Sequence, residues 1–280
     1  MTDTRIEEIE AFWDRRPCNI RHSSQPTNTL AYSQEVALKK HRAEPHLPIF
    51  ADFEKWKGCW VLELGCGIGT ETLCFAKAGA HVVAIDMSSK SLEICRQRLL
   101  SEGVHSNVTL IEGNIEELDK LLTPILPLFD LVWSWGVLHH TPHPNKVLNQ
   151  VKKWIHGKTE LRIMVYSRWS FKLIENMHIH NQWDWSDTAT DTLIQTYAEA
   201  QTGCPLARTY TFDEIQNDLL PEWRIQSIHK DHIFKWNVPS YLRQEWVVSD
   251  TFKNMSDERF RSLEKELGWH TLVCAFKKRQ

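Results

Sequence analysis

The chain has 280 residues, of which 42% are hydrophobic and 25% are charged, and its formal net charge is −3 at pH 7. A chain of this length can bury a substantial core, and its near-neutral charge excludes the broad basic surface of a typical nucleic-acid-binding protein. Seven cysteines without a framework spacing favour a reducing compartment over a disulfide scaffold. The acidic N-terminus lacks the apolar core of a signal peptide, and no apolar run is long enough to cross a membrane. We therefore expect a cytoplasmic protein without membrane or nucleic-acid partners.

Apolar strand patterns alternate with helical patterns between residues 58 and 166, which is typical of a parallel sheet covered by helices. The predicted strands cover residues 60–65, 81–87, 107–114, 129–136 and 160–167, and the predicted helices cover residues 70–79, 88–103, 115–122 and 145–157. This part of the chain is expected to bind a ligand at the carboxyl ends of its strands.

The flanking segments are less regular. Residues 1–57 contain helical fragments interrupted by prolines, which predicts an N-terminal extension that acts as a lid. Residues 167–222 predict a helical cap after the fifth strand, and residues 223–280 predict two late strands, 223–234 and 269–278, separated by a helix. We expect residues 1–280 to form a single domain.

The segment VLELGCGIGT, residues 61–70, places three glycines directly after the first strand. Glycine there lets a ligand lie against bare backbone. A dinucleotide fingerprint requires a third glycine at the position of Thr70, so the spacing disfavours a nicotinamide cofactor. Glu63, at the carboxyl end of the strand, would repel a pyrophosphate and attract a cation. S-adenosylmethionine carries a sulfonium and an ammonium and has no phosphate, so it fits this pattern.

Polar residues also end the next two strands. Asp86 lies about twenty residues after the glycines, where an acidic side chain typically binds ribose hydroxyls. Asn114 ends the third strand with an amide that can pair with an adenine edge, and Ile115 can pack on the ring.

Together these residues resemble the class I S-adenosylmethionine-dependent methyltransferases. The resemblance rests on four segments in family order and spacing, ELGCGIGT, VVAIDMS, EGNIEEL and FDLVWSWGVLHHTPHP. It implies an α/β fold with a Rossmann-like, seven-stranded, mostly parallel sheet, helices on both faces and a late antiparallel strand pair. It also implies S-adenosyl-L-methionine as cofactor and S-adenosyl-L-homocysteine as product.

The resemblance further implies the cofactor-binding residues. Glu63, Gly65, Cys66 and Gly67 are expected at the methionine and ribose end, Asp86 and Met87 at ribose and adenine, Asn114 and Ile115 at adenine, and Ser134, Trp135 and Gly136 at the methionine moiety. Asn114 departs from the aspartate that is common at this position of the family.

His139 and His140 follow the fourth strand and are the candidate catalytic residues. Histidine can act as a general base near neutral pH, and the alternative is that one of the pair hydrogen-bonds backbone and shapes the loop. His143 completes an HHxxH pattern, but neighbouring histidines generally diverge and no carboxylate or cysteine joins the set, so no metal is expected.

The segments that flank the predicted sheet are rich in aromatic and basic side chains. In the family the N-terminal segment commonly covers the cofactor, and the chain after the fifth strand commonly forms the acceptor pocket. The resulting candidates are Trp13, Arg16 and His22 for the lid, and Tyr166, Arg168, Trp169, Trp183 and Trp185 for the pocket. Aromatic walls suit an apolar or cationic acceptor; the alternative is that these tryptophans fill the core.

The expected activity is methyl transfer to a nucleophilic nitrogen or oxygen atom of a small molecule, as in specialised metabolism. A second hypothesis is methyl transfer to a protein, a peptide or RNA. A third hypothesis, from another functional class, is a regulatory or interaction domain that binds S-adenosylmethionine without methyl transfer. No residue pattern identifies the acceptor or the oligomeric state.

Overall fold

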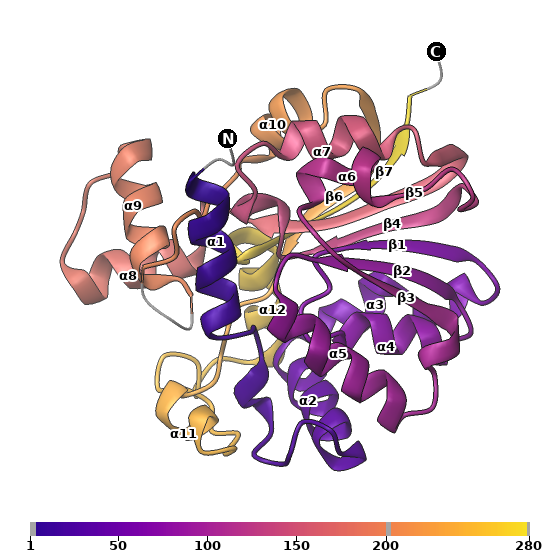
Figure 1. Ribbon diagram of the computed structural model, residues 1–280. Coiled ribbons are helices and arrows are strands. Elements are labelled where there is room, and N and C mark those ends of the chain that lie inside the picture. Colours follow the sequence, from indigo (N-terminus) through magenta and orange to yellow (C-terminus); the bar gives the residue numbers. More distant parts are fainter. Residues whose placement is uncertain (1–3, 200–202, 279–280) are drawn as a thin grey trace.

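The protein is described by a computed structural model that covers residues 4–199 and 203–278. Seven strands form one sheet in the order β3-β2-β1-β4-β5-β7-β6 (Figure 1). They are β1 (Trp60–Leu64), β2 (His81–Asp86), β3 (Val108–Glu112), β4 (Phe129–Trp135), β5 (Ile155–Tyr166), β6 (Trp223–Asp231) and β7 (His270–Lys277). The first five strands run parallel, and β7 is antiparallel to both of its neighbours, β5 and β6. The predicted seven-stranded, mostly parallel sheet with a late antiparallel pair is therefore confirmed.

Helices cover both faces of the sheet (Figure 1). One face carries α2 (Leu30–Ala43), α3 (His46–Ala51), α4 (Thr70–Lys77) and α5 (Ser89–Ser101), and the other carries α6 (Leu118–Leu121), α7 (Pro144–Val151) and α10 (Phe212–Glu214). Short 3-10 or π turns are η1 (Ile20–His22), η2 (Phe53–Trp56), η3 (His105–Asn107), η4 (Ile115–Glu117), η5 (Leu138–His140) and η6 (Ile215–Leu219).

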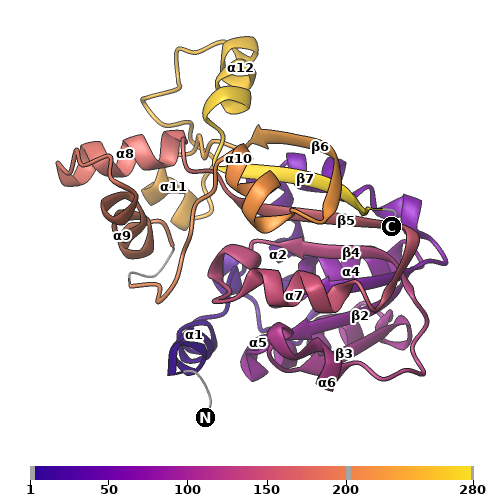
Figure 2. The ribbon, with the colours of Figure 1, turned by 90° about the horizontal axis from the view of Figure 1, so that it is seen from above.

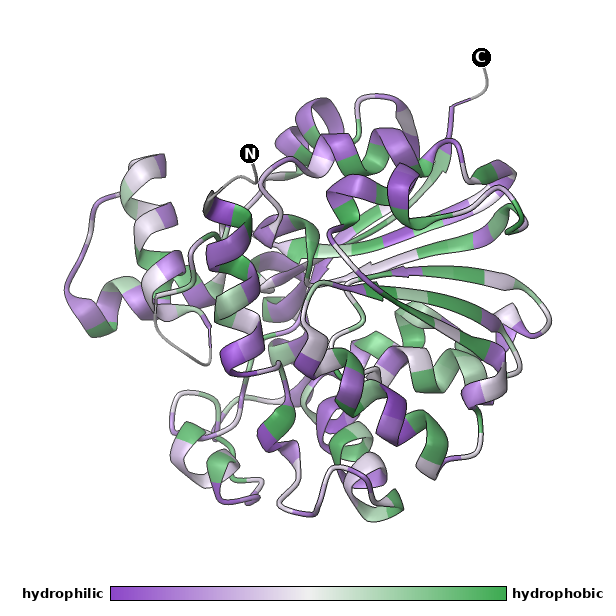
Figure 3. Cartoon of the chain, viewed as in Figure 1, coloured by the Kyte–Doolittle hydropathy of each residue, from purple (hydrophilic) through white to green (hydrophobic). Residues whose placement is uncertain are grey.

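Alternate residues of β1 build the two halves of the core, because successive side chains of a strand point to opposite faces. Val61 packs in a cluster with Phe75 and Trp133, whereas Leu62 packs in a cluster with Leu148 and Val151. Figure 3 shows the strands as largely hydrophobic and the helices as mixed, which is the pattern of a sheet enclosed by amphipathic helices.

The boundary between α7 and β5 differs from the prediction. The helical pattern was expected to continue to Gly157, but α7 ends at Val151 and β5 already begins at Ile155. Ile155 pairs with Phe129 of β4, and Phe129 N donates to Trp154 O at 2.9 Å. This pairing with the neighbouring strand outweighs the local helical preference.

Part of the N-terminal extension belongs to the core. Leu47, Ala51 and Trp56 are buried against the sheet in the cluster that contains Trp133. The first helix of the extension, α1 (Thr4–Arg15), lies instead at the end where the parallel strands finish (Figures 1 and 2).

The chain after β5 forms α8 (Phe171–His180) and α9 (Asp187–Tyr197), which lie beyond the same end of the sheet as α1 (Figure 2). Phe12 of α1 packs with Leu173 and Met177 of α8 and Leu193 of α9, so α1 is attached to this helical cap. Two further helices, α11 (Val238–Leu242) and α12 (Asp257–Leu267), lie between β6 and β7 in the chain. In the described ranges no helix has the length and apolarity needed to cross a membrane.

Candidate active site

A cavity lies at the carboxyl ends of the parallel strands, where open α/β sheets bind their ligands. Most of the predicted cofactor-binding residues line it. They are Gly65, Cys66 and Gly67 after β1, Asp86 and Met87 at the end of β2, Asn114 and Ile115 after β3, and Trp135 and Gly136 at the end of β4. The structure thus brings together side chains from four separate segments.

The glycine loop is held to the second strand by Asp86. Gly67 N donates to Asp86 Oδ2 at 2.7 Å, and Ser88 N donates to Asp86 Oδ1 at 2.9 Å. Burial raises the pKa of Asp86, and these backbone hydrogen bonds oppose that shift. Gly65 has φ +75°, and a Cβ there would collide with the side chain of Val137. Only glycine fits this turn, so the loop backbone can form one wall of the cavity.

Asn114 lines the cavity and also shapes it. Its Oδ1 accepts a hydrogen bond from Glu116 N at 2.9 Å and caps the η4 turn. Ile115, the next residue, is buried and lines the cavity beside it.

Two of the expected cofactor contacts lie behind the wall of the cavity. Glu63 is 2% exposed, and its Oε2 accepts a hydrogen bond from Thr72 Oγ1 at 2.6 Å. Burial, with the nearby Glu71 carboxylate, raises the pKa of Glu63 well above its ordinary value. Ser134 is fully buried within β4. Neither residue lines the cavity, because each lies on a strand with its side chain buried in the protein interior.

The two candidate catalytic histidines separate. His140 lines the cavity, but His139 does not and is fully buried. The ring of His139 lies 3.6 Å from that of Tyr166, centroid to centroid, and neither of its nitrogens has a hydrogen-bond partner within the described residues. Burial, and then the neighbouring His140, lower the pKa of His139 well below its ordinary value. The η5 turn directs only His140 towards the cavity, so His140 is the candidate catalytic histidine that the cavity leaves accessible.

His140 is held by two acceptors. Its Nδ1 lies 2.6 Å from Leu206 O, and its Nε2 lies 3.5 Å from Glu199 Oε1. Burial alone would lower the pKa of His140, but its contacts with Cys204 and Glu199 outweigh burial and raise it to about 10. An imidazolium that donates through both nitrogens cannot accept a proton at neutral pH. The geometry therefore favours an orienting or electrostatic role over the general base of the sequence hypothesis.

Of the lid and pocket candidates, Trp13 and Tyr166 line the cavity. Trp13 of α1 packs edge-on against His140, with ring centroids 5.1 Å apart. The Tyr166 hydroxyl donates to Glu199 Oε1 at 2.6 Å.

The other lid and pocket candidates lie elsewhere. Arg16 lines a separate surface hollow. His22 Nε2 contacts the Tyr241 hydroxyl at 2.9 Å, and Arg168 forms ion pairs with Asp187 and Glu214. Three tryptophans are exposed on the outside of the cap, Trp169, Trp183 and Trp185, with 44%, 51% and 50% of their surface accessible.

Several cavity residues were not anticipated. Lys40 and Glu71 form a buried ion pair at 2.9 Å, and Glu44 Oε2 accepts a hydrogen bond from Trp135 Nε1 at 3.0 Å. All three charged residues line the cavity, as do Glu199 and His270. Lys40 and Glu44 come from α2 and the residue after it, Glu71 from α4, Glu199 from the end of the cap and His270 from the start of β7, so the fold brings them together.

These features fit the Rossmann-like methyltransferases, because a glycine loop follows β1 and an acidic residue ends β2. The absence of a dinucleotide fingerprint disfavours a nicotinamide-dependent enzyme. A family model described as a methyltransferase domain matches residues 55–209, which is more than half of the chain. The chain therefore belongs to the methyltransferase domain family. The predictions of a class I S-adenosylmethionine-dependent methyltransferase, and of S-adenosylmethionine as its cofactor, are confirmed.

Curated relatives match about a third of the chain. The chain is 36% identical over 92 residues to ubiquinone biosynthesis O-methyltransferase of Bordetella avium, covering 33% of this chain and 36% of that protein. It is 33% identical over 102 residues to magnesium-protoporphyrin O-methyltransferase of Rhodobacter capsulatus, covering 36% of this chain and 42% of that protein. The chain thus matches less than half of the length of these two relatives.

Solved structures share the fold over more of the chain. Magnesium protoporphyrin IX methyltransferase from Synechocystis, with bound S-adenosylhomocysteine, aligns with a TM-score of 0.56 at 13% identity, covering 99% of this chain and all of that one. An S-adenosylmethionine-dependent methyltransferase from Mesorhizobium loti aligns with a TM-score of 0.54 at 15% identity, covering 83% and 97% of the two chains. At these identities the likeness concerns the fold.

Proposed function

We propose that this protein transfers the methyl group of S-adenosylmethionine to an oxygen atom of a small molecule, with a nitrogen acceptor as the less favoured case. The observation that carries the proposal is the cavity itself, which joins the glycine loop and Asp86 to an aromatic and ionisable region around Trp13, Tyr166 and His140. A site of this kind has room for a cofactor at one end and an acceptor at the other.

The cofactor half of the proposal places ribose against Asp86. Each carboxylate oxygen accepts one backbone hydrogen bond and keeps a second lone pair for a ribose hydroxyl. Asn114 and Ile115 would then border the adenine, and Gly65 to Gly67 with Trp135 and Gly136 would border the methionine moiety. Glu63 would act from behind, because its bond to Thr72 secures the loop and the first turn of α4.

The acceptor half of the proposal uses the lid and the cap. Ile6, Ile9 and Trp13 of α1 line the cavity, and Asp14 Oδ1 accepts hydrogen bonds from Ser88 Oγ at 2.8 Å and Lys90 N at 3.0 Å. This attachment lets α1 exclude water while the acceptor lone pair is held in line with the sulfonium methyl, and positioning of this kind supplies most of the rate enhancement.

The curated relatives are O-methyltransferases by name, and their acceptors are small molecules. We infer a small-molecule acceptor for this chain because α1 lines one side of the cavity through Ile6, Ile9 and Trp13, which narrows the access that a protein or RNA acceptor needs.

Calorimetry with S-adenosylhomocysteine, NAD and ATP tests the cofactor assignment, and a coupled assay for S-adenosylhomocysteine release tests the transfer. The proposal expects binding of S-adenosylhomocysteine alone, and product release that depends on an added acceptor fraction. Tight NAD binding would overturn the cofactor assignment. Binding without release in the presence of any acceptor would support a domain that binds the cofactor without transfer.

A further inference from the structure

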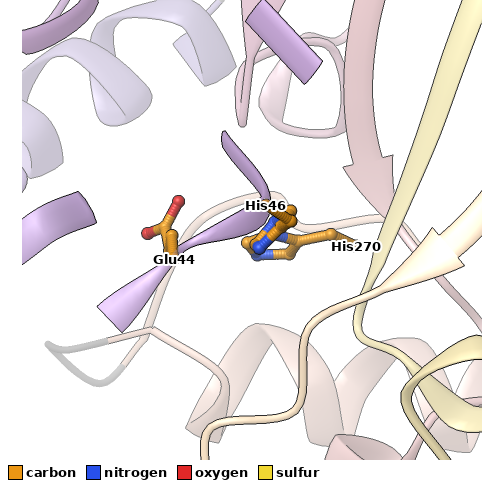
Figure 4. Close-up of side chains that lie close together, drawn as sticks. All are labelled: Glu44, His46 and His270. Atoms are coloured by element: carbon orange, nitrogen blue, oxygen red, sulfur yellow. The ribbon is translucent and has the colours of Figure 1, made fainter. Parts of the chain in front are cut away.

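Two histidines and a glutamate converge at the acceptor end of the cavity. They are Glu44, which follows α2, His46, which begins α3, and His270, which begins β7 (Figure 4). One ligand atom from each residue can be chosen so that all three lie within 4.8 Å of one another. The closest pair is His46 Nε2 and His270 Nδ1, at 2.9 Å. Within the described residues this is the one group of three that meets such a spacing.

The spacing is close to that of a tetrahedral metal site. Bonds of about 2.0–2.2 Å from zinc to nitrogen or oxygen place neighbouring ligand atoms roughly 3.3 Å apart. The two imidazole nitrogens, at 2.9 Å, are slightly nearer than this, and a Glu44 carboxylate oxygen lies within 4.8 Å of both. Small side-chain rotations would therefore place one cation between the three ligands and leave its fourth position open.

The surroundings orient these ligands as metal sites require. Trp135 Nε1 donates to Glu44 Oε2 at 3.0 Å and fixes the carboxylate. His46 is 6% exposed, and its second nitrogen, Nδ1, has no hydrogen-bond partner within the described residues but faces Asp231 Oδ1 at 4.0 Å. A carboxylate behind a histidine is the usual means of orienting a metal-ligating imidazole. His232 stacks on His46, with ring centroids 5.1 Å apart, and packs the cluster from outside.

The cluster faces the reaction site. Glu44 and His270 line the same cavity as Gly136, Met164 and Tyr166. His270 pairs with Tyr166 across β5 and β7, and β7 begins where the parallel strands end. The open position of a bound cation would therefore point to the acceptor end rather than to the ribose end.

We infer that Glu44, His46 and His270 form a binding site for a divalent transition-metal cation, zinc or a similar ion, whose open position takes the oxygen atom of the methyl acceptor. This inference rests on the proposed function for its catalytic part. The ligand set of two imidazoles and one carboxylate is one that zinc and other first-row metals accept.

The chemical consequence concerns the acceptor proton. Coordination lowers the pKa of a hydroxyl, so the acceptor releases its proton to solvent water. The oxygen lone pair then forms a bond to the methyl carbon as the bond from that carbon to sulfur breaks, and the bonding electrons stay on sulfur to give S-adenosylhomocysteine. This supplies the deprotonation that His140, held as an imidazolium by Glu199, does not provide.

Cobalt(II) titration of the untagged, chelator-treated full chain tests the site, because visible absorption reports tetrahedral coordination without any turnover. The expected result is one bound cobalt per chain that zinc displaces. His46→Gln, His270→Gln and Glu44→Gln should each weaken binding by about 100-fold or more, and Asp231→Asn should weaken it by about 10–100-fold. His143→Gln is the matched control, because that histidine is exposed, pairs with Glu116 at 3.0 Å and does not belong to the cluster.

Thermal unfolding and S-adenosylhomocysteine affinity, measured on the same samples, show whether each variant is folded. Glu44→Gln is the safest of the three, because glutamine can still accept the Trp135 hydrogen bond. Wild-type binding of cobalt weaker than about 1 mM, or unchanged binding in folded Glu44→Gln and His270→Gln, would overturn the metal site. Failure to bind S-adenosylhomocysteine would overturn the proposed function instead, and the metal titration would still decide this inference.

Discussion

The Nε2 atom of His140 lies 3.5 Å from Oε1 of Glu199, and both residues line the cavity. The pair attaches the η5 turn after β4 to the end of the cap. Because the same carboxylate oxygen accepts a hydrogen bond from Tyr166, the pair also positions an aromatic wall of the cavity.

This pair predicts a pH-dependent stability. The pKa of His140 is raised from 6.5 to about 10, so its stabilisation is fully present below about pH 6.5 and is lost as the pH rises through 10. Glu199→Gln should therefore lower the free energy of unfolding by about 3 kcal/mol near pH 6.5, and the difference from wild type should shrink towards pH 10. Urea unfolding of both proteins at several pH values measures this difference in the free energy of unfolding.

The control is Glu93→Gln, which removes an exposed partner of Arg96 far from His140 in the chain. Its unfolding curve should follow the wild type at every pH. A constant difference between Glu199→Gln and wild type from pH 6.5 to 10 would show that His140 is not a charged partner.

The two neighbouring histidines should respond differently to substitution. His139→Leu keeps a similar volume and removes ring nitrogens that have no partner in the described part of the chain, so stability and turnover should change little. His140→Leu breaks the contact with Glu199 and should lower turnover by up to about 10²-fold through misplacement of the acceptor. Steady-state kinetics of both variants shows whether only the change at His140 lowers turnover, and S-adenosylhomocysteine affinity checks that each variant is folded. Equal losses in both variants would mean that His139 also reaches the acceptor.

Asp86 should matter for cofactor affinity beyond its part in the loop. Asp86→Ala removes the ribose acceptor and the partner of Gly67 N, and should weaken S-adenosylhomocysteine binding by about 1–3 kcal/mol. Asp130→Ala is the matched control, because Asp130 accepts a hydrogen bond from Trp60 N at 2.8 Å at the opposite end of β1. Calorimetry should show a loss of affinity for the first variant alone, and equal affinities would refute the ribose assignment.

Gly65 of the glycine loop should not tolerate a side chain. Gly65→Ala and Gly103→Ala both place a Cβ on a residue with positive φ, but only at Gly65 does this Cβ collide with a neighbour. The change at Gly103 should cost about 1–2 kcal/mol of stability from φ alone, and the change at Gly65 a further 1–3 kcal/mol or so from overpacking against Val137. Thermal unfolding of the two variants separates these contributions, and equal costs would contradict the close contact.

The lid assignment is tested by removal of residues 1–24. The sheet should stay folded because the first residues packed in its core cluster belong to α3, but α1 would no longer cover the cavity, and turnover should fall as water enters. Trp13→Ala is a milder variant that keeps the Asp14 contacts with α5. Full activity of the truncated protein would refute the lid, and global unfolding would show that the segment belongs to the core.

The strands and the cofactor end of the site could be predicted because their signals are local. The glycines, Asp86 and Asn114 each follow a short apolar strand, and parallel strands end at one edge of a sheet. The rest of the cavity could not be predicted, since Glu44, Glu199 and His270 meet through packing of segments that are distant in the chain. A dipeptide of two histidines does not reveal that the 3-10 turn directs only His140 into the cavity. A Trp-rich segment looks the same whether its rings face inward or outward, so the sequence did not show that Trp169, Trp183 and Trp185 are exposed.

The most direct test of the central claim uses S-adenosylmethionine that carries an isotopic label in its methyl group. The protein is incubated with this cofactor and a cell extract, and the products are separated by molecular mass. We expect S-adenosylhomocysteine to accumulate and the label to appear in a low-molecular-mass, oxygen-methylated product, with both signals reduced for Asp86→Ala. Label in protein or RNA, or cofactor binding with no labelled product, would contradict the account.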